Sequence, residues 1–170
     1  MKKKKKNYDH DAEKVSINVD MDKLSENEVD EFKKLPSHEI TKWKMFKGIE
    51  QAVKRNEEYF NSISIWSYGI DNGSQPKDSR AFDCRRLNMR GHGLDLRFGR
   101  GCDDNFQKIA QSDPEFMEFI YLVAKCVIEN NLTNIAFYCS KGHHRSVAAA
   151  TLFKNMFAKE AKIYHTCLKK

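Results

Sequence analysis

The sequence lacks any apolar run of the roughly 18–20 residues that a membrane-spanning helix requires. A lysine run, Lys2–Lys6, stands near the start, but polar and charged residues follow it, so no secretory signal peptide is predicted. The five cysteines are an odd number at scattered spacings, which indicates free thiols in a reducing compartment. We therefore expect an intracellular, cytoplasmic protein with no membrane partner, and Lys2–Lys6 leave a nuclear location open.

The positive charge is unevenly distributed along the 170 residues. The net charge is +6, and residues 1–35 contribute nothing to it because five lysines in Lys2–Lys6 offset a net −5 over residues 7–35. Five of the eight arginines fall between Arg85 and Arg100, where Asp95 is the one acidic residue. This basic stretch predicts an anionic partner.

Three units are expected along the chain. Residues 1–22 are polar with blocks of charge, which predicts a disordered tail. Residues 23–61 predict a helical extension, because a capping box at Ser25 and Glu28 precedes a short helix and amphipathic spacing runs from His38 to Phe60. Residues 62–170 form the third unit, a globular domain.

Strands and helices alternate in that third unit. Strands are expected at 62–68, 81–87, 134–138 and 162–165. Helices are expected around 107–110, from a second capping box at Ser112–Glu115 to about Asn131, and over 146–158. This alternation predicts an α/β fold with a mostly parallel sheet and flanking helices.

Residues 137–147 read FYCSKGHHRSV and place a C-x-x-G-x-x-R-S pattern between a strand and a helix. Unpaired N–H groups and the positive end of a helix dipole meet at such a junction and favour an anion. Gly142 allows a tight loop, Arg145 offers a planar fork to phosphate oxygens, and Ser146 is expected to cap the helix. Further donors or cations come from Lys141, His143 and His144. The pattern predicts an anion site.

Catalysis is an alternative use of the same loop. A thiol beside a helix amino end and cations has a lowered pKa, so Cys139 and Arg145 are compatible with a cysteine-dependent phosphatase. Such an enzyme also needs a general acid, and the context singles out none among Asp103, Asp104 and Asp113. We therefore assign no catalytic residue. Cys139, His143 and His144 lack a second ligand pair, so no metal is predicted.

Three segments together resemble one known family. They are ISIWSYGIDNGSQPKDSRAFDCRRL, IAFYCSKGHHRSVAAATLF and KIYHTCLKK. In this order they resemble the C-terminal domain of the RapZ family, the bacterial RNase adapter proteins. Phe82–Leu87 fits a phenylalanine-aspartate-x-arginine-x-leucine element, Cys139–Val147 fits the loop, and His165 and Leu168 fit the final strand. The resemblance covers residues 62–170.

The resemblance implies an α/β domain that binds RNA and, in some members, a phosphorylated amino sugar. Carried over residue by residue, the implied pocket contains Asp83, Arg85, Cys139, Ser140, Lys141, Gly142 and Arg145. The family places a proline-asparagine-proline run after its leucine, whereas this sequence has Asn88–His92. The expected RNA-contacting residues are Arg86, Arg90, Arg97, Arg100, Lys169 and Lys170.

The function expected from these observations is a non-enzymatic module that binds RNA or a phosphorylated small molecule. No G-x-x-x-x-G-K-[ST] motif occurs in the sequence, and no cofactor is expected. Two alternatives stay open: the phosphatase, and a scaffold whose residues 1–60 recruit a protein partner.

Overall fold

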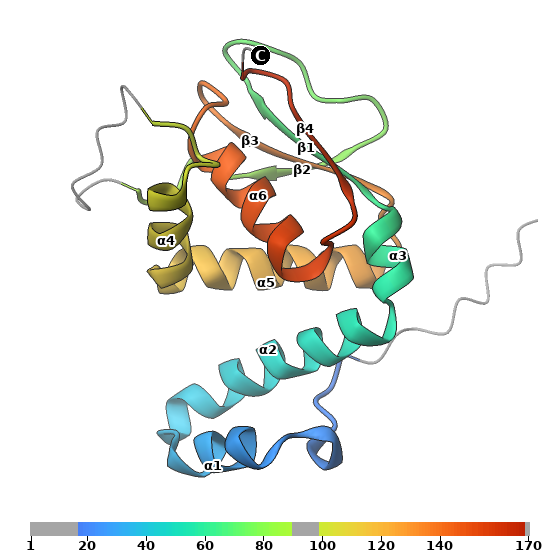
Figure 1. Ribbon diagram of the computed structural model, residues 1–170, viewed down its shortest axis with the longest axis vertical. Coiled ribbons are helices and arrows are strands. Elements are labelled where there is room, and N and C mark those ends of the chain that lie inside the picture. Colours follow the sequence, from blue (N-terminus) through green and yellow to red (C-terminus); the bar gives the residue numbers. More distant parts are fainter. Residues whose placement is uncertain (1–16, 90–98, 169–170) are drawn as a thin grey trace, which may run out of the picture.

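A computed structural model describes residues 17–89 and 99–168. Its centre is a sheet of parallel strands in the spatial order β2-β3-β1-β4 (Figure 1). The parallel pairing confirms the predicted α/β class. The strands are β1 (Ser64–Gly69), β2 (Arg80–Asp83), β3 (Asn134–Cys139) and β4 (Lys162–His165).

Helices precede the sheet and connect its strands. Ahead of β1 lie a 3-10 turn η1 (Met21–Lys23) and helices α1 (Glu26–Lys34), α2 (Ser37–Arg55) and α3 (Glu57–Ser62). Helices α4 (Asp104–Ser112) and α5 (Pro114–Asn130) connect β2 to β3, and α6 (Arg145–Phe157) connects β3 to β4. The helical extension is thus confirmed, although the single helix expected over 38–60 is divided at Asn56.

The handedness of the strand connections explains why the helices cover one face of the sheet. The β2-to-β3 and β3-to-β4 connections run in one direction across the sheet, whereas the β1-to-β2 connection runs in the other. Since parallel crossovers are right-handed, the β1-to-β2 connection must lie on the opposite face of the sheet from α5 and α6. That connection is the loop of residues 70–79, which contains no helix. One face is therefore packed by helices and the other is crossed by a loop.

The core fills the space between the sheet and the helices. Side chains alternate along β3, so Ile135, Phe137 and Cys139 all face α5 and α6. The ring of Phe137 lies 6.3 Å from that of Phe119 on α5 and 5.8 Å from that of Phe153 on α6. Alanines 148, 149 and 150 of α6 are fully buried. Their small side chains let this helix lie close to the sheet.

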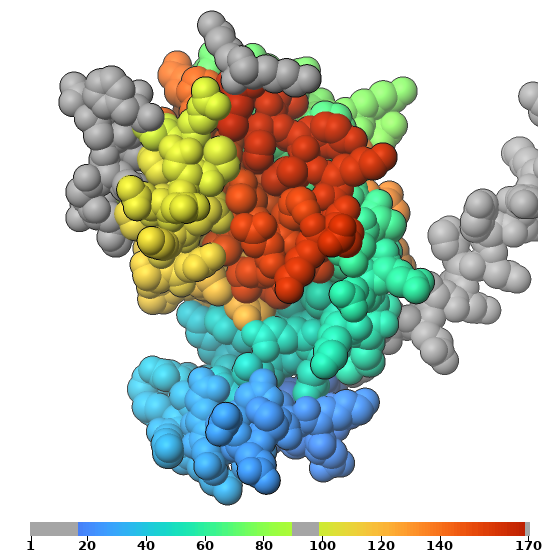
Figure 2. All heavy atoms as spheres, viewed as in Figure 1, coloured from blue at the N-terminus to red at the C-terminus, as the bar shows by residue number. Residues whose placement is uncertain are grey.

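Helix α2 lies against α5, and α1 packs on α2, so that the two form a lobe at one end of the molecule, blue to cyan in Figure 2. The rings of Phe46 and Tyr121 stack at 4.1 Å, and the Tyr59 hydroxyl donates to the carbonyl oxygen of Leu132 at 2.8 Å. Burial of Tyr59 raises its pKa to about 12. Both α2 and α3 therefore contact α5 or the residues that directly follow it.

Residues 17–22, which the sequence assigns to the disordered tail, lie along α2. A Cβ atom at Gly48 would lie 2.0 Å from the carbonyl oxygen of Ile17, so the backbone of this segment touches the helix. Asp20 exchanges two hydrogen bonds with the Gln51 side chain, at 2.7 and 2.9 Å. Residues 1–16 of the predicted tail lie outside the described residues.

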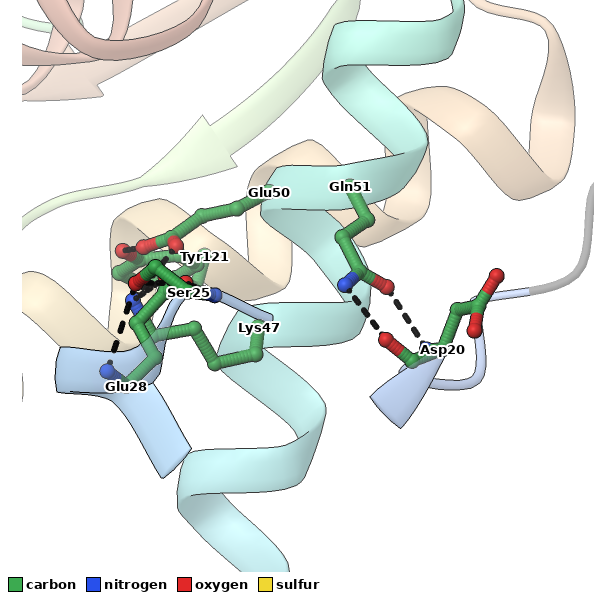
Figure 3. A network of polar contacts seen from close by, with 7 residues as sticks. All are labelled: Asp20, Ser25, Glu28, Lys47, Glu50, Gln51 and Tyr121. Carbon is green, nitrogen blue, oxygen red and sulfur yellow. Dashed lines mark hydrogen bonds and ion pairs between the residues drawn. The ribbon is translucent and has the colours of Figure 1, made fainter. Parts of the chain in front are cut away.

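A polar network connects α1, α2 and α5 (Figure 3). The predicted capping box at Ser25 and Glu28 is confirmed. Lys47 on α2 reaches Glu28 at 3.0 Å and Glu50 at 3.1 Å, and the Tyr121 hydroxyl donates to Glu50. The Ser25 backbone N–H and then Lys47 hold the pKa of Glu28 at about 2. Polar contacts thus reinforce the apolar packing of the extension.

Several boundaries differ from those predicted, and two of the differences have a clear local cause. Strand β2 ends at Asp83 instead of Leu87, because the Asp83 carboxylate accepts the Arg85 backbone N–H at 2.9 Å and turns the chain. The predicted capping box at Ser112 is wrong. Asp113 is the N-cap of α5 and accepts from the Phe116 backbone N–H at 2.8 Å, while Ser112 ends α4. Asp113 holds this position because Pro114 starts the helix directly after it.

Candidate anion-binding site

The loop between β3 and α6 lies against the turn that follows β1. Gly142 has φ +76, and a Cβ there would lie 2.4 Å from the Gly69 backbone nitrogen. The predicted special conformation of Gly142 is thus confirmed. The turn after β1 donates to the three loop carbonyl oxygens of residues 139, 140 and 141, each at 3.0 Å. These bonds fix the path of the loop.

Cys139 lies inside the loop, 3% exposed. Its Sγ accepts the Gly142 backbone N–H at 3.3 Å and lies 3.2 Å from the Ser146 hydroxyl oxygen. The thiol therefore fills the interior beneath the loop. Two of the aspartates considered as a general acid bind backbone N–H groups: Asp103 that of Arg100 and Asp113 that of Phe116.

Ser146 is fully buried and is the second residue of α6. The prediction that it caps the helix is wrong, because α6 begins one residue earlier, at Arg145. His144 occupies the N-cap position and its side chain makes no capping hydrogen bond. Ser146 therefore contributes its hydroxyl to Cys139 and not to the helix end.

Arg145 extends away from the loop toward the end of β2, where its guanidinium donates to the backbone carbonyl oxygen of Arg85. The two arginines line a pocket of about 390 Å³. We call it the arginine pocket. Its lining residues are Arg85, Arg86, Leu87, Asn88, Met89, His144 and Arg145. None of these described residues is acidic, so the pocket is positively charged.

Asp83 lies beside the arginine pocket and holds Arg85. The carboxylate accepts from the Arg85 guanidinium at 2.7, 3.0 and 3.1 Å. These bonds lower the pKa of Asp83 to about 2 and raise the pKa of Arg85. The same guanidinium lies 5.5 Å from the centre of the Tyr138 ring. Arg85 is therefore oriented by a carboxylate and an aromatic face at once.

The end of the basic stretch and the residues that follow it support the other side of the loop. The His144 ring stacks on Phe106 at 5.5 Å, and its Nε2 lies 3.0 Å from the Gly99 carbonyl oxygen. Gly101 donates its backbone N–H to the His143 carbonyl oxygen at 2.9 Å. The His143 ring lies edge-on to the His144 ring at 6.2 Å, whereas Cys139 Sγ contacts Gly142 and Ser146. Within residues 17–89 and 99–168, no group of three His, Cys, Asp or Glu side chains is placed to hold a metal ion.

The remaining predicted residues lie at varied places. Lys141 is exposed and its Nζ is 3.2 Å from Asp71, while Ser140 is half-buried and its carbonyl oxygen accepts from Asp71. Arg100 is exposed in the turn that precedes α4. The structure therefore gathers only part of the predicted basic set. Outside the described residues lie Arg90, Arg97, Lys169 and Lys170.

Sequence reasoning missed several residues of the site. Asn88 and Met89 line the arginine pocket, and Cys167 Sγ accepts the Gly69 backbone N–H at 3.3 Å beside Gly142. Tyr138, which contacts the Arg85 guanidinium, was also missed, although the alternation along β3 places it on the face opposite Phe137. No local pattern indicated that Asn88, Met89 or Cys167 belongs to the site.

The family described as the RapZ C-terminal domain matches residues 61–169. The chain belongs to the RapZ C-terminal domain family. This match confirms the resemblance and includes the whole sheet, α4 to α6 and the arginine pocket. The RapZ match starts after α1 and α2, so those helices precede the family domain.

A curated relative is called a nucleotide-binding protein and comes from Thermotoga sp. (strain RQ2). It is 30% identical over 114 residues, which cover 62% of this chain and 41% of that protein. The chain thus matches less than half of the length of this relative. In the part of the chain that the structure describes, no helix combines the length and hydrophobicity of a membrane span.

Proposed function

We propose that this RapZ C-terminal domain binds a phosphate group, carried by a nucleotide, a phosphorylated sugar or RNA, in the arginine pocket. One observation carries the proposal. Arg85, Arg86 and Arg145 come from segments far apart in the sequence and line one pocket without an acidic residue among its described lining. Asp83 pairs with Arg85, and the nearby charges of Arg86 and Arg145 would be stabilised by a bound anion. The name of the Thermotoga relative supports a nucleotide as one source of the phosphate.

Two of these arginines already have their guanidinium groups oriented by hydrogen bonds within the protein. Arg145 is the first residue of α6, where backbone N–H groups and the helix dipole also favour an anion. Its guanidinium is fixed by the Arg85 carbonyl oxygen, and the Arg85 guanidinium is fixed by Asp83. Side chains that are already oriented lose less entropy when the ligand binds.

The pocket volume suits a small ligand or one nucleotide of a longer chain. About 390 Å³ lies near the lower end of the range of ligand pockets, roughly 300–1,000 Å³. The loop itself offers less room than the sequence suggests, because Cys139 and Ser146 fill its interior. We therefore place the phosphate at the Arg145 side of the loop and not above the thiol.

Calorimetric titration of the protein with a mononucleotide, a hexosamine phosphate and a short single-stranded RNA tests the proposal. Arg145→Ala should weaken binding of the preferred probe at least about tenfold, the cost of one charge-assisted contact. Arg145→Lys should recover only part of the affinity, because lysine lacks the planar fork. Arg80→Ala removes the same charge at the other end of β2 and should change little. Equal affinities for the parent protein and Arg145→Ala would refute the proposal.

The two alternatives drawn from the sequence have less support. The buried, hydrogen-bonded thiol of Cys139 favours a structural role over attack on a substrate. A protein partner recruited by residues 1–60 stays a prediction. In the described part of that segment α2 packs on α5 and α1 packs on α2, and no observation there indicates a partner.

A further inference from the structure

The face of the sheet away from α5 and α6 carries aromatic side chains. Phe137 faces the helices, so its neighbours Ala136 and Tyr138 face the other way, and the strand register places Trp66 beside Ala136 and Tyr164. We call Trp66, Tyr138 and Tyr164 the aromatic face. Parallel sheets are normally covered on both faces. Among the described residues, the loop of residues 70–79 is what crosses this one.

Trp66 and Tyr164 form a stacked pair near the edge strand β4. Their ring centres lie 4.2 Å apart with the planes inclined by 21°. The indole N–H donates to the Asn134 side chain at 2.7 Å, and Asn134 in turn donates to the Lys77 carbonyl oxygen at 3.0 Å. Tyr164 is nevertheless 40% exposed. One side of its ring is held by a fixed indole, and its exposed surface faces solvent.

Tyr138 extends the aromatic face to the arginine pocket. Its ring lies 5.5 Å from that of the buried Tyr68, and the Arg85 guanidinium lies 5.5 Å from its centre. Because Arg85 also lines the arginine pocket, the pocket and the aromatic face share one side chain. A ligand with its phosphate in the pocket therefore has an aromatic surface directly beside it.

Lysines lie around the aromatic face, and the loop of residues 70–79 adds two exposed aspartates, Asp78 and Asp71, of which Asp71 pairs with Lys141. Lys162 lies two residues before Tyr164 on the same face of β4 and is exposed. No ion pair within residues 17–89 and 99–168 involves Lys162 or Lys77, and the one carboxylate on this face of β2, Asp83, is bound to Arg85. A surface that combines basic side chains with one exposed and two half-buried aromatic rings suits single-stranded nucleic acid, whose bases stack while its phosphates pair with lysine and arginine. An apolar peptide would gain nothing from this charge.

We propose that the aromatic face stacks unpaired bases of single-stranded RNA, with one base on the exposed ring of Tyr164. The proposal rests on the proposed function in that the arginine pocket holds a phosphate of the same strand. The aromatic side chains of the sheet would stack on the bases with little dependence on sequence, and the arginines would bind the phosphate. Duplex RNA, whose bases are already stacked, should bind this face poorly.

Trp66 provides a direct readout. The other tryptophan, Trp43, is buried and its indole N–H has no hydrogen-bond partner in the described structure, so Trp43→Phe removes its fluorescence without breaking a hydrogen bond. In this background, single-stranded RNA of about ten nucleotides should quench Trp66 emission. Tyr164→Ala should weaken RNA binding about 5- to 100-fold, the usual range for one stacked base, and Tyr164→Phe should retain the affinity. Leu122→Ala removes an exposed apolar side chain from α5 and is the matched control.

Inorganic phosphate and a hexosamine phosphate separate this proposal from the proposed function. Tyr164→Ala should leave their affinities unchanged, whereas Arg145→Ala should lower them. If Tyr164→Ala binds single-stranded RNA like the parent while Arg145→Ala is impaired, stacking is wrong and the phosphate site stands. If neither variant is impaired with any probe, both proposals fail. Equal losses with single-stranded and duplex RNA would also overturn stacking, because the face would then contact the backbone.

Discussion

The guanidinium of Arg145 donates a hydrogen bond to the backbone carbonyl oxygen of Arg85, 60 residues earlier in the chain. The contact joins the start of α6 to the turn after β2. A carbonyl oxygen fixes the direction of the guanidinium without cancelling its charge, as a carboxylate would. Arg145 therefore stays available to an anion while its side chain is ordered, which is the arrangement that a phosphate pocket needs.

Gly142→Ala should destabilise the fold by about 2 kcal/mol or more, because φ +76 is unfavourable for alanine and the new Cβ would overlap the Gly69 backbone. Urea unfolding followed by circular dichroism measures the change. The matched control is Gly73→Ala, where the nearest atom to a Cβ is 3.7 Å away. Equal stabilities for the two variants would show that the loop tolerates a side chain and does not depend on this close contact.

Cys139 should resist alkylation in the native protein. Its thiol is buried beneath the loop, and Cys84 is fully buried with a pKa that burial raises, whereas Cys102 is exposed. Brief treatment with iodoacetamide followed by peptide mass spectrometry should therefore modify Cys102 first and leave the other two intact until the protein is unfolded. Rapid modification of Cys139 would instead indicate an accessible thiolate and revive the phosphatase alternative.

Lys47→Met should weaken the attachment of the extension. Burial opposes the charge of Lys47, but its bonds to Glu28 and Glu50 raise its pKa overall, and removing it leaves two carboxylates without that cation. We expect a loss of about 1 kcal/mol, measured by urea unfolding. The pKa of Glu28 should rise from about 2 toward its ordinary value in an NMR titration. Lys54→Met, an exposed position on the same helix, should do neither.

His165 should make stability depend on pH. Its Nδ1 lies 2.7 Å from the buried Ser67 hydroxyl oxygen, and burial lowers its pKa from the ordinary 6.5. The unfolded chain therefore binds a proton at His165 more readily than the folded protein does. The contribution of neutral His165 to the free energy of unfolding is complete above about pH 6.5 and is lost as the pH falls toward the folded-state pKa.

The free energy of unfolding should therefore fall more between about pH 8 and about pH 5 in the parent protein than in His165→Gln. The other histidines are common to both proteins and cancel in the comparison. Asp83 and Glu28 do not interfere, because their lowered pKa values matter only below the ordinary range of a carboxyl group. Identical pH dependence in the two proteins would contradict a role for His165.

Local patterns predicted the elements whose signals lie within a few residues. The Ser25 capping box, the special conformation of Gly142 and strand β4 were all readable, since each depends on neighbours in sequence. The errors occurred where two local signals competed. Asp113 replaced Ser112 as the cap of α5, and the Asp83 turn ended β2 early.

The sequence by itself determined the alternation of strands and helices, the family and the glycine-arginine loop, because hydrophobic period and motif spacing are local properties. Only the tertiary structure decided what that loop faces. The parallel register and right-handed crossovers bring Arg85 beside Arg145, bury Cys139 and, in the described part of the chain, leave the aromatic face without a helix. These outcomes depend on how distant strands are ordered in the sheet, and no stretch of neighbouring residues encodes that order.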